Sequence, residues 1–219
     1  MKSLSVSNTR GVIFDFDGVI VDSEPFWNSA DRIVVEQEGK EFIPDVKNIV
    51  MGLAPAASVA EICRFHKILT APKKILKKRE NLMKKFYESV IELNCGAYEI
   101  LEYLYLRKVK IALASSTPKR LFEKALKRFR IDRFFDVIVT SDDIEKSKPD
   151  PEIFFRARKL LGLPSSELII VEDSRAGVEA AIAAGIKVFW LRTASVDLKG
   201  LHPDYIINSL TDLMLYFER

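Results

Sequence analysis

Cysteine, histidine and long apolar runs are all scarce in this sequence. Its 219 residues include two cysteines, Cys63 and Cys95, in no metal-binding spacing, and two histidines outside any cluster of ligands. We expect no disulfide framework, so a cytoplasmic localisation is predicted. No stretch reaches the roughly 18 consecutive apolar residues of a membrane-spanning helix. The first ten residues are polar and predict a loose tail, and no membrane partner is expected.

An excess of one charge is also absent. The sequence has 34 basic and 31 acidic residues, for a formal net charge of +3. This balance argues against nucleic acid as the default partner. The segment Lys67–Lys85 departs from this charge balance, because the segment contains eight basic residues and one acidic residue. Its basic residues lie opposite an apolar stripe when the segment is drawn as a helix, so we expect a solvated helix face.

The sequence does contain an acidic pair next to an apolar run. Asp15 and Asp17 follow Val12–Phe14, which predicts a short buried strand. Residues two apart on an extended chain point to the same side, so both carboxylates face one way. Gly18 lets the chain turn where the strand ends. Two adjacent carboxylates repel each other, so the pair predicts a hard divalent cation that binds oxygen ligands.

The segment 24–93 contains only helical patterns, whereas strands and helices alternate from residue 96 on. Alternation is typical of parallel strands joined by crossover helices. We therefore expect an α/β fold with a doubly wound parallel sheet formed by 1–23 and 94–219. The segment 24–93 is predicted to be an all-α cap inserted between the first and second core strands. The predicted helices of the cap are Glu24–Gln37, Val46–Gly52, Ala56–His66 and Pro72–Leu93. The later predicted strands are Val109–Ala114, Val137–Thr140, Leu168–Val171, Lys187–Leu191 and an edge strand at Tyr205–Ile207, and the later helices are Tyr98–Leu106, Pro118–Phe129, Pro151–Leu161, Arg175–Ala184 and Leu210–Phe217.

Polar residues follow several of the predicted strands. Ligands of open α/β sheets bind outside the carboxyl ends of the strands. Ser115 and Ser116 end the second strand, Lys148 precedes the helix after the third, and Glu172–Asp173 end the fourth. These groups are predicted to meet the first acidic pair at one edge of the sheet. Such a set suits a phosphate whose charge is balanced by Mg²⁺.

If the ligand is a phosphate, the acids can bind the metal. Asp15 and Asp173 are the predicted Mg²⁺ ligands, with Glu172 as a further ligand or a neighbouring partner. The main-chain carbonyl of Asp17 is predicted to supply another oxygen.

The remaining groups can bind and transfer the phosphate. Ser115, Ser116 and Lys148 are the predicted phosphate-binding residues. Asp15 is predicted to attack phosphorus, which produces an aspartyl-phosphate. Asp17 is predicted to protonate the leaving oxygen and then to take a proton from the attacking water.

These residues resemble the four motifs of the haloacid dehalogenase superfamily. The matching segments are Asp15-Phe16-Asp17-Gly18-Val19, Ser115, Lys148-Pro149 and Glu172-Asp173-Ser174. A helical insert between the first two motifs is similar to that of members with a small α-helical cap, which include β-phosphoglucomutases and many sugar phosphatases. The resemblance implies a Rossmann-like core, dependence on Mg²⁺ and an aspartyl-phosphate intermediate.

Single residues separate the activities of this superfamily. Haloacid dehalogenases and phosphonate hydrolases lack the second aspartate, so Asp17 favours phosphoryl transfer. β-Phosphoglucomutase-like members tend to carry a histidine near the place of Trp27 and a basic residue near that of Pro55. These differences favour a phosphatase, a phosphoric monoester hydrolase, over a phosphosugar mutase, which stays the alternative. A non-enzymatic binding module is less favoured, because the set of acids is complete.

The expected substrate is a small phosphorylated metabolite, with a sugar phosphate as the first candidate. Specificity in such proteins depends on the cap, where one sequence does not fix the positions of the side chains. The chain is expected to act as a monomer. The candidate substrate contacts in the cap are Glu24, Trp27, Gly52 and Leu53.

Overall fold

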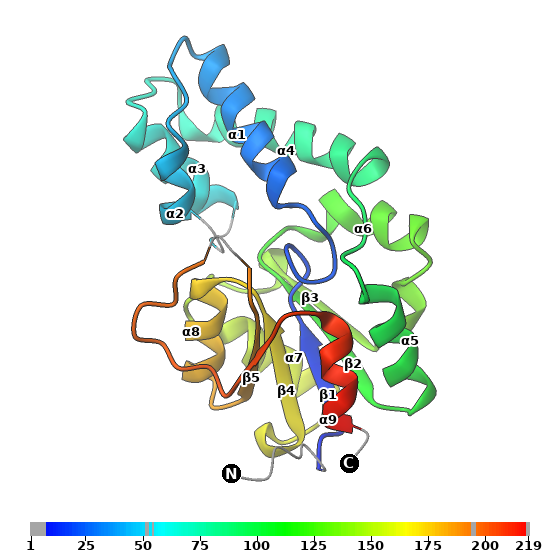
Figure 1. Cartoon of the computed structure of the whole chain (residues 1–219). Coiled ribbons are helices and arrows are strands. Elements are labelled where there is room, and N and C mark those ends of the chain that lie inside the picture. Colours follow the sequence, from blue (N-terminus) through cyan, green and yellow to red (C-terminus); the bar gives the residue numbers. More distant parts are fainter. Residues whose placement is uncertain (1–7, 51–52, 54, 194–195, 218–219) are drawn as a thin grey trace.

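A six-stranded sheet forms the centre of the structure (Figure 1). The computed structural model describes residues 8–50, 53, 55–193 and 196–217. The strand order is β3-β2-β1-β4-β5-β6 and every pair is parallel, which confirms the predicted α/β, Rossmann-like fold. The strands are β1 (Gly11–Phe14), β2 (Lys110–Ser115), β3 (Val137–Thr140), β4 (Leu168–Glu172), β5 (Lys187–Leu191) and β6 (Tyr205–Ile207).

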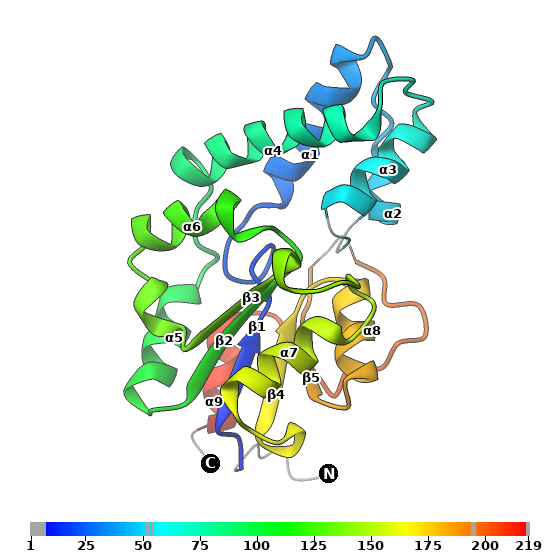
Figure 2. The same cartoon turned by 180° about the vertical axis from the view of Figure 1, so that it is seen from behind.

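Helices cover both faces of the sheet (Figures 1 and 2). Alternate strand residues point to opposite sides, so both faces of the buried strands are apolar. Phe14 packs in one apolar cluster and Ile13 in the other. The helices that contribute to the first cluster include α5 (Ala97–Leu106) and α6 (Lys119–Arg128), and those of the second are α7 (Glu152–Leu161) and α8 (Arg175–Ala183).

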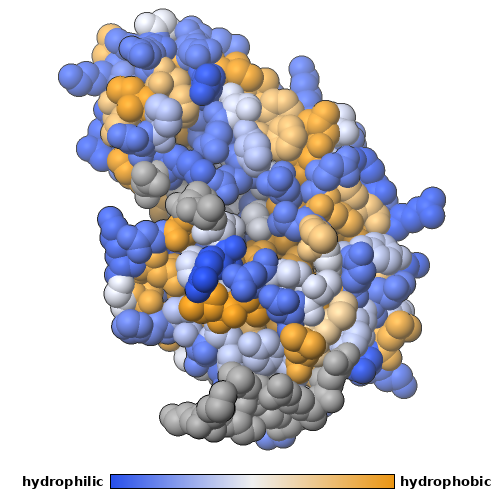
Figure 3. Space-filling model, viewed as in Figure 1, coloured by the Kyte–Doolittle hydropathy of each residue, from blue (hydrophilic) through white to orange (hydrophobic). Residues whose placement is uncertain are grey.

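A helical segment lies beyond the carboxyl ends of the strands (Figure 1). It has its own apolar cluster, which includes Val34, Ile62 and Ile75. Hydrophilic side chains predominate on the face of this segment that Figure 3 shows. We retain 24–93 as the extent of the proposed cap. Its elements are α1 (Glu24–Gln37), the 3₁₀ helix η1 (Pro44–Val46), α2 (Lys47–Val50), α3 (Pro55–Phe65) and α4 (Pro72–Ser89).

The chain leaves the sheet and returns to it at one place. Val21 and Leu93 form an antiparallel bridge between the outgoing and returning segments. Beside it, the main-chain N of Asp22 donates to the carbonyl O of Glu92 at 3.0 Å, and the N of Asn94 donates to the O of Ile20 at 2.9 Å. The two connections to the helical segment are therefore paired with each other.

Several predicted helices differ in extent from those of the structure. The predicted helix Val46–Gly52 is instead η1 followed by α2, which ends at Val50, and residues 51–52 lie outside the described residues. The predicted helix Pro72–Leu93 ends at Ser89, because the chain beyond it becomes the returning connection. The predicted helix Leu210–Phe217 is a 3₁₀ helix, η5 (Leu210–Leu213), followed by α9 (Met214–Phe217).

The basic segment of α4 is only in part a solvated face. Arg79 is buried, with 4% of its surface exposed, and it pairs with Asp31 of α1. The expectation that all the basic residues face solvent is therefore wrong for Arg79. Within the described residues, no helix is long and apolar enough to cross a membrane.

Candidate active site

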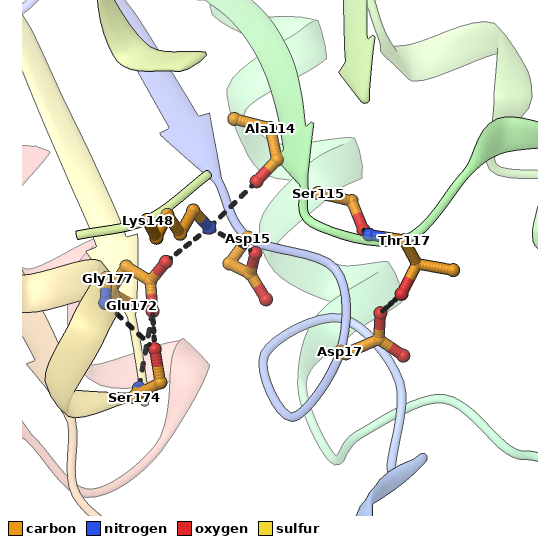
Figure 4. A network of polar contacts seen from close by, with 9 residues as sticks. All are labelled: Asp15, Asp17, Ala114, Ser115, Thr117, Lys148, Glu172, Ser174 and Gly177. Carbon is orange, nitrogen blue, oxygen red and sulfur yellow. Dashed lines mark hydrogen bonds and ion pairs between the residues drawn. The ribbon is translucent and has the colours of Figure 1, made fainter. Parts of the chain in front are cut away.

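The candidate active site lies at the carboxyl ends of β1, β2 and β4 (Figure 4). Asp15 follows β1, Ser115 is the last residue of β2, and Glu172 is the last residue of β4. These strands are neighbours in the order β2-β1-β4, so residues far apart in the sequence meet at one edge. Lys148 reaches the same place from the loop before α7.

Lys148 connects two of the acids. Its Nζ donates to Oδ1 of Asp15 at 2.6 Å, to Oε1 of Glu172 at 2.6 Å and to the carbonyl O of Ala114 at 3.1 Å. Burial by itself lowers the pKa of Lys148, but the carboxylates of Asp15 and Glu172 outweigh it and raise the pKa above its ordinary value. The ammonium group therefore stays charged and holds one oxygen of Asp15.

Two glycines leave room for the other acid oxygens. Oε2 of Glu172 accepts hydrogen bonds from the main-chain N and Oγ of Ser174 at 3.2 and 3.1 Å, and Ser174 caps α8. A Cβ atom at Gly177 would lie 1.9 Å from Cδ of Glu172. A Cβ atom at Gly18, where φ is +82°, would lie 2.1 Å from Oδ2 of Asp173. A larger residue at either position would displace an acid.

Asp15, Glu172 and Asp173 form a group that can hold a metal ion. Their closest carboxylate oxygens lie within 4.8 Å of one another, and all three residues are buried. Burial raises the pKa of Asp15 to about 8, against the effect of Lys148. Burial and then Glu172 raise the pKa of Asp173. One lysine does not balance three buried carboxylates, and their oxygen donors fit Mg²⁺. The carboxylate of Asp17 lies outside this group, so its main-chain carbonyl remains the predicted ligand.

Among the described residues, four side chains donate hydrogen bonds to Asp17. Oδ1 accepts from Oγ of Ser23 at 2.6 Å, from Nε1 of Trp27 at 3.2 Å and from the phenol of Tyr87. Oδ2 accepts from Oγ1 of Thr117 at 2.7 Å. Burial and the neighbouring Asp17 carboxylate raise the pKa of Tyr87 well above its ordinary value, so the phenol stays a donor. Asp17 is therefore held jointly by the core loop after β2, the outgoing connection, α1 and α4.

The hydroxyl residues after β2 occupy different places. Ser115 is fully buried, and its Oγ accepts from the main-chain N of Thr117 at 3.0 Å. Ser116 and Thr117 line a cavity beside the acids, and Ser115 is not among the described residues of its wall. Of the two predicted phosphate-binding serines, Ser116 is thus the one at the cavity surface.

A cavity of about 110 Å³ lies between the acids and the helical segment. Asp15, Asp17, Lys148 and Asp173 line its core side. Its size suits a small molecule rather than a polymer. Of the predicted cap contacts, Glu24, Trp27 and Leu53 line the cavity, and Gly52 lies outside the described residues. The other polar lining residues of the helical segment are Asn28, Asp31, Lys47, Ser58 and Arg79, and the apolar ones include Val50 and Pro55.

The sequence-based prediction of the site leaves out Asp31, Arg79 and Tyr87. One signal for Arg79 was present in the sequence. Ile75, Arg79, Met83 and Tyr87 recur at four-residue steps, so all four lie on one stripe of α4. A basic residue on an apolar stripe indicates a buried partner.

This chain is similar to known proteins in both sequence and structure. The family model of the haloacid dehalogenase-like hydrolases matches residues 12–191. The phosphorylated carbohydrates phosphatase of Thermotoga maritima is 34% identical over 178 residues, which cover 81% of this chain and 82% of that protein. The phosphoglycolate phosphatase of Pseudomonas fluorescens is 31% identical over 183 residues, or 81% of this chain and 67% of that protein. A β-phosphoglucomutase structure from Clostridium difficile, 22% identical, has a TM-score of 0.85 with 96% of each chain covered, which shows a shared fold.

The family match includes all four motifs and extends over the helical segment and most of the sheet. The two curated relatives are phosphatases, which confirms the predicted enzyme class, a phosphoric monoester hydrolase. The chain belongs to the haloacid dehalogenase-like hydrolases, as its four motifs predict.

Proposed function

We propose that this hydrolase is a Mg²⁺-dependent phosphatase of a small phosphorylated metabolite, with a sugar phosphate as the expected substrate. The observation that carries the proposal is the contact of Lys148 with Oδ1 of Asp15 at the wall of a cavity that the helical segment covers. The second oxygen of Asp15 is then available as a nucleophile. As part of the proposal the chain acts as a monomer in the cytosol, where the free cysteines Cys63 and Cys95 would stay reduced.

The first half-reaction transfers the phosphoryl group to the protein. An oxygen of Asp15 attacks phosphorus, the bond from phosphorus to the leaving oxygen breaks, and Asp17 gives that oxygen a proton. Lys148 supplies a positive charge beside the phosphate, and the groups around Ser115 and Ser116 hold the phosphate oxygens. The products are an aspartyl-phosphate and the free alcohol of the metabolite.

The second half-reaction restores the protein. A water molecule gives a proton to Asp17 and attacks phosphorus, and the bond to Asp15 breaks to release inorganic phosphate. The hydrogen bonds from Thr117 and Tyr87 keep Asp17 in position for both proton transfers. Mg²⁺ bound by the acidic group supplies the positive charge that a dianionic phosphate needs among carboxylates.

A phosphosugar mutase is the second candidate function. The observation that bears on it is that two cap cations, Lys47 and Arg79, line the cavity wall, each paired with a carboxylate that a second phosphate would have to displace. A hexose 1-phosphate supplied with its bisphosphate primer distinguishes the two functions. A phosphatase releases inorganic phosphate faster than it forms the isomeric hexose phosphate.

The substitution Asp15→Asn tests the proposed function. We expect the variant to fold and to release no phosphate from a panel of phosphate esters with Mg²⁺, because an amide is a poor nucleophile. A matched control is Asp132→Asn, an exposed aspartate in the 3₁₀ helix η2 (Asp132–Phe134), which should retain wild-type activity. Phosphate release by folded Asp15→Asn at the wild-type rate would contradict the proposal.

A further inference from the structure

The helical segment adds to the cavity a polar wall that the proposed reaction does not use. Asp31 of α1, Ser58 of α3 and Arg79 of α4 all line the cavity. Nε of Arg79 donates to Oδ1 of Asp31 at 2.5 Å, and Nη2 donates to Oδ2 at 3.0 Å. Only 5% of each side chain is exposed. Three helices thus bring a buried ion pair and a hydroxyl to one wall.

The hydroxyl of Ser58 lacks a partner. Its Oγ is buried and has no hydrogen bond within the part of the chain that the structure describes, and the residue is 2% exposed. Leaving a buried hydroxyl unpaired is unfavourable. Because Ser58 lines the cavity, a rotation about its Cα–Cβ bond would offer the hydroxyl to a polar group of a bound ligand.

The charges of the wall cancel. Arg79 pairs with Asp31, and Lys47 pairs with Glu24, so the two cations face two carboxylates. A second phosphate or a carboxylate of a ligand would meet the acids as well as the bases and gain little net attraction. A hydroxyl, in contrast, donates to a carboxylate and accepts from a guanidinium at the same time.

The ion pair is also fixed in place. The guanidinium carbon of Arg79 lies 4.4 Å from the ring centroid of Trp27, and Nε1 of Trp27 donates to Asp17. The polar wall is therefore connected, through Trp27, to Asp17, the residue proposed to exchange protons with the substrate. A ligand held by this wall would have its leaving oxygen at a set distance from the proposed acid.

We propose that Asp31, Ser58 and Arg79 form a hydroxyl-binding subsite that selects a neutral polyol or sugar as the leaving group and disfavours a second anionic group. The proposal rests on the proposed phosphatase function and adds the class of substrate and the residues that read it. A site built to bind hydroxyls rejects analogues that lack them, because its buried polar groups are then left unpaired.

Three substrates test the subsite in the wild-type protein with Mg²⁺. They are sorbitol 6-phosphate, n-hexyl phosphate and fructose 1,6-bisphosphate. We expect kcat/KM for sorbitol 6-phosphate to exceed that for n-hexyl phosphate by about 10- to 100-fold, as for one or two hydrogen bonds to charged groups. The bisphosphate should be poorer than the polyol ester. Equal values for the polyol and hexyl esters, or a preference for the bisphosphate, would overturn the subsite. Failure to release phosphate from any ester would instead overturn the phosphatase function.

Two variants assign the preference to the wall. Ser58→Ala should lower the ratio of polyol to hexyl kcat/KM about fivefold, the value of one neutral hydrogen bond. The double variant Asp31→Asn with Arg79→Met should lower the ratio to about five, the contribution that Ser58 retains. Both charges are removed together because a single change leaves a buried charge unpaired.

The matched control is Ser29→Ala. Its exposed hydroxyl on α1 donates to the carbonyl O of Pro25 at 2.8 Å, away from the described cavity wall, so the ratio should stay at the wild-type value. Unfolding midpoints in urea check that each variant is folded. A wild-type ratio in folded Ser58→Ala and in the folded double variant would overturn the proposal.

Discussion

Both oxygens of Glu172 are already engaged by the protein. Oε1 accepts from Lys148 and Oε2 accepts from Ser174, so this carboxylate links the buried ammonium to the start of α8. Gly177 allows it, because the first turn of α8 passes directly over the carboxyl group. In addition to any role as a metal ligand, Glu172 fixes the position of Lys148. Through Lys148 it also positions Asp15, the proposed nucleophile.

Gly177→Ala tests this contact. Replacing an exposed glycine by alanine stabilises a helix by about 1 kcal/mol. At this position, however, the added Cβ would overlap Glu172. We expect a loss of stability of about 1–3 kcal/mol, typical of overpacking, and a fall in phosphatase activity. Urea unfolding measures the stability. Glu179→Ala, at an exposed position of α8, serves as the control, and a gain of stability in Gly177→Ala would contradict the expected contact.

At the scale of elements, α4 belongs to both parts of the molecule. Ile75 in its first half packs in the cluster of the helical segment, whereas Met83 and Tyr87 in its second half pack with Phe16 and Phe122 of the core. Three ion pairs also join α4 and the returning connection to α6. They are Arg120–Glu80 at 2.6 Å, Lys124–Glu88 at 2.9 Å and Arg128–Glu92 at 3.8 Å.

The double variant Glu80→Lys with Glu88→Lys tests these pairs. It removes two attractions and adds two repulsions, each of the order of 0.2–1 kcal/mol at partly exposed sites. We expect a loss of about 1–2 kcal/mol in low salt and a smaller loss in high salt, because salt screens exposed charges. Urea unfolding at the two salt concentrations measures both effects.

Two further variants make the element-scale test specific. Glu99→Lys with Glu102→Lys changes the net charge equally at exposed positions of α5, so it should cost little. Adding Arg120→Glu and Lys124→Glu to the first double variant should restore the stability. A quadruple variant as unstable as the double variant would show that the contacts between α4 and α6 are not electrostatic.

At the scale of the whole molecule, the carboxyl edge of the sheet carries more acidic than basic side chains among the described residues of the site. The strand order brings Asp15, Glu172 and Asp173 together, with Lys148 as their buried basic partner. Burial, and then their mutual repulsion, raises the pKa values of Asp15 and Asp173, so keeping these acids charged opposes folding. A cation bound by the folded protein should therefore stabilise the entire fold.

Adding Mg²⁺ is expected to raise the melting temperature. At about 100 times Kd, one bound ion contributes about 2.7 kcal/mol, which corresponds to roughly 5–10 °C for a protein of this size. Differential scanning calorimetry with Mg²⁺ and with a chelator measures the shift, and NaCl of equal ionic strength is the control. Asp173→Asn should reduce the shift, because it removes a charged ligand. Equal melting temperatures with Mg²⁺ and NaCl would contradict a metal site here.

Sequence patterns predicted those elements whose bounds depend on local signals. The bounds of Glu24–Gln37 and Lys187–Leu191 agree with the structure, because an amphipathic period defines the first and a short apolar run defines the second. The end of α4 at Ser89 could not be predicted, since it depends on Leu93 pairing with Val21 far away in the sequence.

Some contacts of the candidate site could likewise be predicted from the sequence, and others could not. The meeting of Asp15, Lys148 and Glu172 follows from the strand order of a doubly wound sheet, which the alternation of elements predicts. The contacts of Tyr87 with Asp17 and of Arg79 with Asp31 depend on how α1 and α4 are rotated against each other. No spacing within a single helix contains that information.

The pairing of Val21 with Leu93 has a consequence for evolution. Because the two ends of the intervening segment are neighbours, the register between β1 and β2 does not depend on the length of the chain between them. Insertions, deletions or exchange of that segment can accumulate while the sheet and the strand-end acids stay unchanged. Descendants of one ancestral gene can thus diverge in which molecules they accept and still inherit the same chemistry.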